Sequence, residues 1–362
     1  MFGKNKLSEV CCFMQVVIPT FKWVDYDRMP DYICMMKHVS ILVPESSVLA
    51  SIGDPRYMFT AVNQFLVQAG KEPLFDVHLV AATKEVKLHD GQFSVHADLL
   101  LEEVAKTDLV FIPALNGDMK EAIQKNSVLI PWIIKQQQSG AEVASLCIGA
   151  FLLASTGLLN GKKCSTHWLY ANEFRKMFPE VSLVDGSIIT EEQGIYSSGG
   201  ASSYWNLLLH LVEKYTDRAT AILASKFFAI EYDRNNQSAF ILFKGQREHT
   251  DPAIKKAQDF IEENFQEKIS VDDLAGQVAV GRRSFERRFK KATSNTVIEY
   301  IQRVKVEAAK KSFESTRKNI NEVMYDVGYT DTKAFRSIFR KITGLTPIEY
   351  RNKYNRQVIP VM

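Results

Sequence analysis

Residues 335–351 read FRSIFRKITGLTPIEYR, and residues 285–300 read FERRFKKATSNTVIEY. At an offset of 50, the two phenylalanines, the basic pair that follows them and the closing Ile-Glu-Tyr coincide. An apolar stripe with helical spacing precedes each of these stretches. The two stripes align at an offset of 49 rather than 50, so the turn between stripe and stretch is one residue longer in the second copy. A short helix, a turn and a second helix therefore occur twice, which predicts helix-turn-helix units in residues 269–300 and 319–350.

Both units show the apolar periodicity of helices that pack on one face. Ser270 or Asp272 is expected to cap the first helix, and a further helix is expected to open at Asp251-Pro252. Between the units, the apolar positions from Tyr300 to Ala308 predict a connecting helix that holds the units at a fixed separation. The residues expected to be buried are Val271, Leu274, Ala275, Val278, Phe285, Phe289 and Ala292 in the first unit and Ile320, Val323, Met324, Val327, Phe335, Phe339 and Ile342 in the second.

The second helix of a helix-turn-helix unit enters the major groove of DNA, so its outward side chains must be donors, acceptors or cations. Arg283 and Arg287 lie one turn apart and can reach guanine edges or phosphates, and Glu286 can accept from the amino group of cytosine. The basic residues further along each helix are expected to hold phosphates. The predicted DNA contacts are Arg283, Glu286, Arg287, Lys290 and Lys291 in the first unit and Thr332, Lys333, Arg336, Ser337, Arg340 and Lys341 in the second.

Charge is distributed unevenly along the chain. From Thr250 onward there are 22 Lys and Arg against 15 Asp and Glu, whereas the residues before Thr250 hold 23 against 27. A basic C-terminal third behind an acidic body favours a polyanionic partner, such as double-stranded DNA, for that third alone. The alternative is that these charges form the solvated faces of an ordinary helical domain. The repeat and its outward side chains favour DNA.

Residues from about 253 to 354 resemble the AraC-type DNA-binding domain. The resemblance implies a sequence-specific transcription regulator, more commonly an activator. The first unit departs from the family pattern, because Gly281 stands at the usual serine cap and Ser294-Asn295 replaces a glycine-containing turn; a less rigid first unit is expected. The matching residues are Leu274-Ala275, Phe285-x-x-Arg288-Phe289-Lys290, Asp326-Val327-Gly328-Tyr329, Phe335-x-x-x-Phe339-Arg340 and Thr343-Gly344-Leu345-Thr346-Pro347-x-x-Tyr350-Arg351.

Residues 37–232 alternate short apolar runs with amphipathic segments. This alternation predicts an α/β domain with a mostly parallel sheet flanked by helices, ahead of an all-α C-terminal domain with the two helix-turn-helix units. The expected strands are residues 39–43, 75–81, 109–113 and 142–146, and the expected helices are residues 56–68, 128–137, 152–159 and 201–215.

Cys147 directly follows one expected strand and leads into a helix through small residues. Parallel sheets bind ligands beyond the carboxyl ends of their strands. A sharp strand-to-helix turn also exposes a side chain beside a helix N-terminus, where the pKa of a thiol is lowered. The turn at Cys147 is therefore the predicted centre of a ligand site.

This region resembles the PfpI-like branch of the class I glutamine-amidotransferase superfamily, and the order of the two domains resembles GlxA-type regulators from about residue 38. The resemblance implies a domain that senses an unidentified small-molecule effector or mediates homodimerisation. The matching motifs are Cys147-Ile148-Gly149-Ala150-Phe151-Leu152-Leu153-Ala154, Gly157-Leu158-Leu159-x-Gly161, Thr166-His167-Trp168 and Ser198-Gly199-Gly200. The predicted ligand pocket comprises Cys147, Ile148, Gly149, His167 and Gly199.

A cysteine hydrolase needs a base beside its thiol and an acid that orients the base. Enzymatic relatives carry a histidine directly after the cysteine, where this chain has Ile148, and a glutamate near the first helix, where it has Asp54-Pro55. A non-catalytic domain is therefore predicted. The alternatives are a PfpI-like cysteine hydrolase or amidase that uses Cys147 and carries a DNA-binding appendage, and a purely structural or dimerising body.

The cysteines and histidines do not show the spacing that is typical of metal ligands. The five cysteines are an odd number without paired metal-ligand spacing, which favours a reducing, cytoplasmic location, and neither a metal nor a cofactor is expected. No apolar run reaches the roughly 18–20 residues that span a bilayer, so no membrane partner is expected. The predicted division is an extension at 1–36, the α/β domain at 37–232, a linker at 233–250 and the DNA-binding domain at 251–356.

Overall fold

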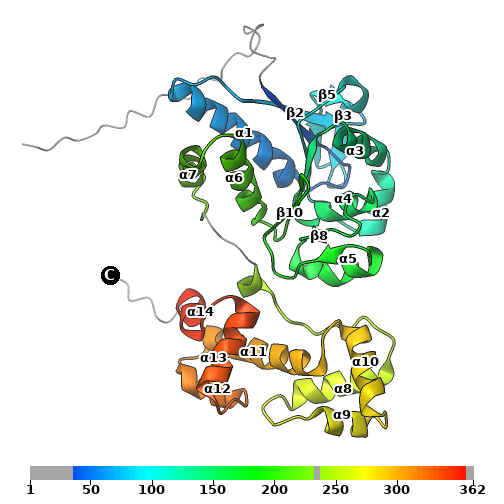
Figure 1. Ribbon diagram of the computed structural model, residues 1–362, viewed down its shortest axis with the longest axis vertical. Helices are drawn as coiled ribbons and strands as arrows, with labels where there is room; N and C mark the ends of the chain where they lie inside the picture. The colour runs from blue at the N-terminus through cyan, green and yellow to red at the C-terminus, as the bar shows by residue number, and fades with distance from the viewer. Residues whose placement is uncertain (1–35, 232–236, 356–362) are drawn as a thin grey trace, which may run out of the picture. The chain divides into compact units, whose positions relative to one another are not determined.

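The α/β domain is built on a sheet that has seven strands within the described residues, in the order β10-β11-β7-β6-β1-β2-β5. The computed structural model describes residues 36–231 and 237–355 (Figure 1). Strand β10 runs antiparallel to β11, and the other pairs are parallel, which confirms the predicted α/β class. The strands are β1 (Lys37–Leu42), β2 (Phe75–Ala81), β5 (Leu99–Leu100), β6 (Leu109–Ile112), β7 (Glu142–Ser145), β10 (Ile189–Glu192) and β11 (Ile195–Ser198).

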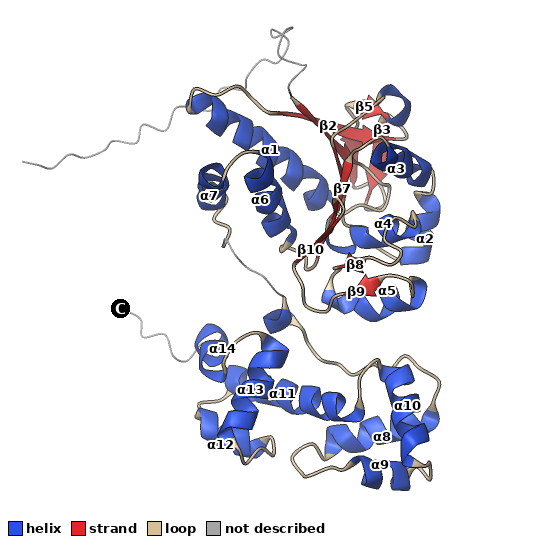
Figure 2. Ribbon diagram, in the orientation of Figure 1, coloured by secondary structure: helices blue, strands red, loops and turns tan. Residues whose placement is uncertain are grey.

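Helices cover both faces of this sheet (Figure 2). Because neither face meets water, the central strands are apolar along their length, and every residue of β6 is buried. On one face lie α1 (Leu49–Gln68), α6 (Tyr204–Tyr215) and α7 (Arg218–Phe227), and on the other lie α2 (Met119–Lys125), α3 (Leu129–Gln138) and α4 (Ala150–Ser155).

Helix α1 begins at Leu49 rather than at residue 56, where the sequence pattern placed its start. The pattern was misleading because proline usually opens a helix, and Pro55 lies inside this one. One local and one tertiary hydrogen bond hold the turn that precedes Pro55. The Ser51 hydroxyl donates to the Val48 carbonyl at 2.6 Å and accepts from the Ala114 N–H at 3.0 Å.

Several short elements were not predicted. Strands β3 (Glu85–Leu88) and β4 (Phe93–His96) form a separate antiparallel hairpin, and β8 (Lys163–Cys164) pairs in parallel with β9 (Ser182–Leu183). Helix α5 (Ala171–Met177) lies between β8 and β9 in the sequence. Elements of two to four residues carry too little periodicity to be recognised from an apolar pattern.

The C-terminal domain is entirely helical and contains both predicted helix-turn-helix units. It has two separate apolar cores, the first around Phe285, Phe289 and Tyr300 and the second around Phe335 and Phe339. Helix α11 supplies residues to both cores, its first half to one and its second half to the other. The helices are α8 (Pro252–Glu263), α9 (Val271–Gln277), α10 (Arg282–Thr293), α11 (Val297–Ser315), α12 (Ile320–Asp326), α13 (Thr332–Thr343) and α14 (Pro347–Tyr354).

The two units differ at the ends of their second helices, as the sequence suggested. Gly281 precedes α10 without a side-chain cap, whereas Asp331 caps α13 by accepting from the Ala334 N–H at 2.8 Å. Both helices end in a left-handed residue, which is Gly344 after α13 but Ser294 after α10. A non-glycine residue is less favourable in that conformation, so the first unit is the more strained of the two.

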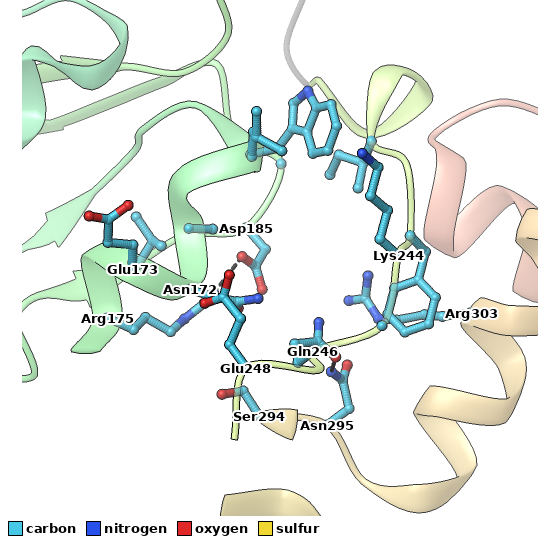
Figure 3. A pocket seen from close by; sticks show the side chains of 18 of the residues that line it. Asn172, Glu173, Arg175, Asp185, Lys244, Gln246, Glu248, Ser294, Asn295 and Arg303 are labelled. Atoms are coloured by element: carbon cyan, nitrogen blue, oxygen red, sulfur yellow. Dashed lines mark hydrogen bonds and ion pairs between the residues drawn. The ribbon is translucent and has the colours of Figure 1, made fainter. Parts of the chain in front are cut away.

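The segment that precedes α8 packs against the helical domain. Figure 3 shows the side chains of Gln246 and Asn295 facing one another, and the Asn295 amide donates to Gln246 Oε1 at 3.1 Å. The Gln258 amide donates to the Gln246 carbonyl at 3.2 Å, and Arg247 pairs with Glu262 at 2.6 Å. Asn295, which departs from the family pattern, therefore has a structural role in holding this segment.

Some predictions fall on residues that are not described. Residues 1–35 of the predicted extension at 1–36, the boundary residues 232 and 356, and the linker positions 233–236 lie outside the described residues. Within the part of the chain that is described, no helix is both long and apolar enough to cross a membrane. The same residues contain no group of three or more His, Cys, Asp or Glu side chains arranged to hold a metal ion.

Candidate nucleic-acid interface

Helix α10 presents its cationic side chains to solvent. Phe285 and Phe289 point into the first core, which leaves Arg283, Glu286 and Arg287 exposed on the outer side. Lys290 and Lys291, one turn further along, are exposed as well. The exposed side of α10 therefore carries the charged side chains that its amphipathic spacing predicts.

Arg288 has a different role from its neighbour Arg287. Its guanidinium donates to both carboxylate oxygens of Asp251, at 2.8 and 2.6 Å, where Asp251 caps α8. This two-point contact lowers the pKa of Asp251. Arg288 therefore fastens α10 to α8, whereas no ion pair of Arg283 or Arg287 is found among the described residues. Those two guanidinium groups remain available for a partner.

Arg282 lies on the same helix but is engaged within the domain. Its guanidinium pairs with Asp272 at 2.8 Å and lies 3.7 Å from Glu286 Oε1. Glu286 thus lies beside a cation on the same outer side of α10. The sequence analysis did not single out Arg282, and its position at the N-terminal end of α10 is the only signal that would have drawn attention to it.

Helix α13 repeats the arrangement. Phe335 and Phe339 are fully buried, whereas Lys333, which precedes them, and Arg336 and Ser337, which lie between them, are exposed. Thr332 at the start of the helix is partly exposed. At the C-terminal end Arg340 and Lys341 are exposed, where cations are also favourable toward the helix dipole.

Helix α11 sets the separation of the two units. It contains 19 residues, and at 1.5 Å per residue it is about 28 Å long. Figure 1 shows α10 and α13 near opposite ends of α11. Two recognition helices bind the same side of a duplex when they are about 34–36 Å apart, the length of one helical turn. The length of α11 is of this order.

The turn that contains Cys147 lies at the carboxyl end of β7, beside the ends of other strands. Cys147 has a φ of 54°, the strained backbone expected of a sharp strand-to-helix turn. Its N–H donates to Ser198 Oγ at 3.3 Å, and its carbonyl accepts from Thr166 Oγ1 at 3.2 Å. The structure therefore brings the motifs that contain His167 and Gly199 into contact with this turn.

The environment of the Cys147 thiol is opposite to the one expected from the turn. The residue is only 5% exposed, and burial raises the pKa of the thiol to about 12. Ile148 and Gly149 are buried too. Burial disfavours the thiolate by removing its hydration, and here this outweighs the backbone hydrogen bond from Ile148, so the thiol stays protonated at neutral pH.

His167 is not placed as a base for this thiol. Its Nδ1 accepts from the Leu169 N–H at 3.1 Å, and its ring packs on Trp168 and Tyr170. Burial lowers the pKa of His167, so the ring is neutral at neutral pH. No hydrogen bond joins His167 to Cys147 within the described part of the chain.

A carboxyl group that the sequence analysis set aside lies in this region. The Tyr204 hydroxyl donates to Asp54 Oδ2 at 2.6 Å, although the residues are 150 positions apart. Burial raises the pKa of Asp54, and the hydrogen bonds from Tyr204 and Trp205 partly oppose this. Negative charge on Cys147 would raise the pKa of Tyr204, which places this pair near the thiol. No local sequence pattern predicts the contact between Tyr204 and Asp54.

Comparison with known proteins agrees with both domains. Residues 274–353 match the family model of a helix-turn-helix domain, and residues 61–214 match that of the DJ-1/PfpI family. The chain is 26% identical over 315 residues to the HTH-type transcriptional regulator GbdR of Pseudomonas aeruginosa (strain UCBPP-PA14), covering 86% of this chain and 83% of that protein.

Two further similarities cover less of the chain. It is 27% identical over 217 residues to the HTH-type transcriptional regulator ArgR of Pseudomonas aeruginosa (strain PAO1), covering 60% of this chain and 66% of that protein. A crystal structure of an AraC family transcriptional regulator from Pseudomonas putida is 16% identical, with a TM-score of 0.42, and covers 53% of this chain and 99% of its own.

The chain is therefore a DNA-binding transcription regulator. It combines an AraC-type helix-turn-helix domain with a DJ-1/PfpI domain, and the resemblances found in the sequence are confirmed.

Proposed function

We propose that the protein binds a specific DNA site through α10 and α13 in two successive major-groove segments. Arg283, Arg287 and Arg336 read guanine edges, and Glu286 accepts from cytosine. The observation that carries this proposal is the exposure of these side chains on two helices related by the repeat and separated by α11. The remaining groups that position the helices on phosphates or nearby edges are Lys290, Lys291, Thr332, Lys333, Ser337, Arg340 and Lys341.

The α/β domain is proposed to sense a small-molecule effector at the carboxyl ends of its strands, around Cys147. The convergence of the segments that contain Thr166 and Ser198 on that turn supports this location. An effector can act only if it binds two states of the regulator with different affinities. We further propose that the working form is a homodimer in the cytoplasm that activates transcription, since activation is the commoner behaviour of the AraC-type regulators that the sequence resembles.

Selection of DNA sites tests the proposed function. The full chain is incubated with random double-stranded DNA, bound sequences are recovered, and the complex with the selected site is analysed by sedimentation. We expect one preferred sequence in which the element read by one chain occurs twice, bound by two chains. Recovery of unrelated sequences would refute specific binding, and one chain per selected site would refute the homodimer.

Cys147 is proposed to be non-catalytic, because its thiol is buried and protonated and no hydrogen bond joins it to His167 in the described part of the chain. We expect Cys147→Ala to leave the affinity for the selected site unchanged within about twofold, since the change removes no group from the DNA surface. Fluorescence anisotropy with labelled DNA measures this. The same variant distinguishes the cysteine-hydrolase alternative. If wild-type protein turned over an amide or aldehyde and Cys147→Ala did not, the non-catalytic assignment would be wrong.

A further inference from the structure

Gln237 places its side chain in the α/β domain, at the loops that surround the Cys147 turn. Its Nε2 donates to the carbonyl of Thr166 at 3.0 Å and to that of Ser187 at 3.1 Å. Its backbone N–H donates to the Gly186 carbonyl at 2.7 Å. The residue is 2% exposed, which is unusual for a glutamine outside any helix or strand.

The carboxamide occupies the space over Gly199, one of the residues predicted to line the ligand pocket. A methyl group at Gly199 would lie 2.1 Å from Gln237 Nε2, and one at Gly200 would lie 3.5 Å from Gln237 Oε1. Thr166, the first partner of the carboxamide, also donates to the Cys147 carbonyl. The side chain of Gln237 is therefore seated where an effector at the strand ends would be expected to bind.

The fit of this carboxamide is incomplete. Oε1 of Gln237 is buried and has no hydrogen-bond partner among the described residues. A buried acceptor that has lost water without gaining a donor destabilises the seated carboxamide. The donor half of the carboxamide is thus satisfied and the acceptor half is not. A group with equivalent N–H donors and no unpaired acceptor would fit better.

The chain that follows Gln237 is bound to the helical domain. Only Ser238–Phe240, a single 3-10 turn, separates Gln237 from Ile241. The Lys310 ammonium donates to the Ile241 carbonyl at 2.6 Å, and the Phe243 N–H donates to Glu307 Oε2 at 3.2 Å.

Lys310 and Glu307 are a buried pair on α11. Their charged groups are 2.9 Å apart, with side chains 3% and 11% exposed. A buried pair is stable only when further hydrogen bonds complete it, and the backbone of this segment supplies them. Helix α11 also packs against both recognition helices. The hydrogen bonds that hold Gln237 therefore restrain the segment that is bound to α11, at the centre of the DNA-binding domain.

We propose that Gln237 is an internal occupant of the effector site. An effector that presents N–H donors without an unpaired acceptor, as an ammonium or a guanidinium group, displaces the carboxamide from the Thr166 and Ser187 carbonyls and frees the segment bound to α11. This inference rests on the proposed sensing function and adds to it the donor chemistry of the ligand and the route by which its binding reaches the DNA-binding domain.

Two substitutions of Gln237 in the full chain test the occupant. Gln237→Ala removes the carboxamide, and Gln237→Glu keeps its shape but replaces Nε2 and its two N–H donors with one carboxylate oxygen that faces two carbonyls. Gln92→Ala, an exposed glutamine in the turn of the β3–β4 hairpin, is the matched control. The readouts are hydrogen exchange of residues 237–243, thermal unfolding with acetamide as the probe, and affinity for the selected DNA site.

In both Gln237 variants we expect exchange of residues 237–243 to rise about tenfold, the factor expected when two hydrogen bonds are lost. Acetamide should bind the vacated space and raise the melting temperature of Gln237→Ala, but not that of wild type or Gln92→Ala. DNA affinity should change by about fivefold or more, as for typical coupling between two sites.

The proposal is overturned if exchange in the Gln237 variants matches that of Gln92→Ala, or if acetamide stabilises wild type as much as Gln237→Ala. It is also overturned if both variants bind DNA with wild-type affinity despite faster exchange, because the segment would then be held without consequence. If wild-type protein binds no specific DNA sequence, the proposed function is contradicted. The exchange and acetamide measurements still decide, independently of that result, whether Gln237 occupies the effector site.

Discussion

The double substitution Arg287→Ala and Arg336→Ala lowers affinity for the selected DNA site by about 2–6 kcal/mol. Each arginine that reads a guanine edge contributes about 1–3 kcal/mol, and losses from separate units are expected to add. Each single variant should relax the preference at one base pair while leaving preference at the other positions intact. Fluorescence anisotropy with the selected site and its single-base variants measures both effects.

The matched control is Lys120→Ala, which removes an exposed cation from α2 in the α/β domain. It should change DNA affinity by less than about 0.5 kcal/mol. Salt provides a second check, because log affinity falls by about 0.9 per phosphate contact for each unit of log salt. Substitution of Lys290 or Arg340 should reduce this slope. If the double arginine variant bound as tightly as Lys120→Ala, the assignment of α10 and α13 as recognition helices would be wrong.

Phe339→Ala destabilises the helical domain by about 3–5 kcal/mol, the cost of emptying a fully buried phenylalanine site. Phe339 is 0% exposed, and its ring lies 5.7, 5.8 and 5.5 Å from those of Phe313, Phe335 and Tyr350. Few of these rings can move to refill the space, because α11, α13 and α14 all contribute to the same core. Phe289→Ala should cost a similar amount in the first core.

Two optical signals separate the domains in this measurement. All four tryptophans precede residue 237, so tryptophan fluorescence does not follow the helical domain, whereas circular dichroism follows helix throughout the chain. Denaturant should therefore remove part of the helical signal early in Phe339→Ala while the fluorescence transition stays in place. Ile348→Ala, at a side chain that is 48% exposed, should shift neither transition by more than about 0.5 kcal/mol. Equal transitions in the two variants would contradict the second core described here.

The repeat, its cores and its outward side chains could be predicted from the sequence because each depends on spacing along a single helix. Phe335 and Phe339 are one turn apart, so burial of one face follows from the 3.6-residue period. Ser270 was one of the two residues predicted to cap the first helix of the first unit. A cap can be predicted from sequence because it acts within three residues. The additional strands and the start of α1 could not be predicted, because packing against distant residues decides them.

What the sequence by itself determined is the class of this protein: two amphipathic, basic helix-turn-helix units and an alternating α/β domain. Their information lies in local periodicity and in motifs of a few residues. Only the tertiary structure decided that Cys147 is buried and protonated, that Asp54 meets Tyr204, and that Gln237 fills the space over Gly199. These contacts join residues from 38 to 150 positions apart, and solvation and hydrogen bonding at such contacts depend on the fold that surrounds them rather than on neighbours in the chain.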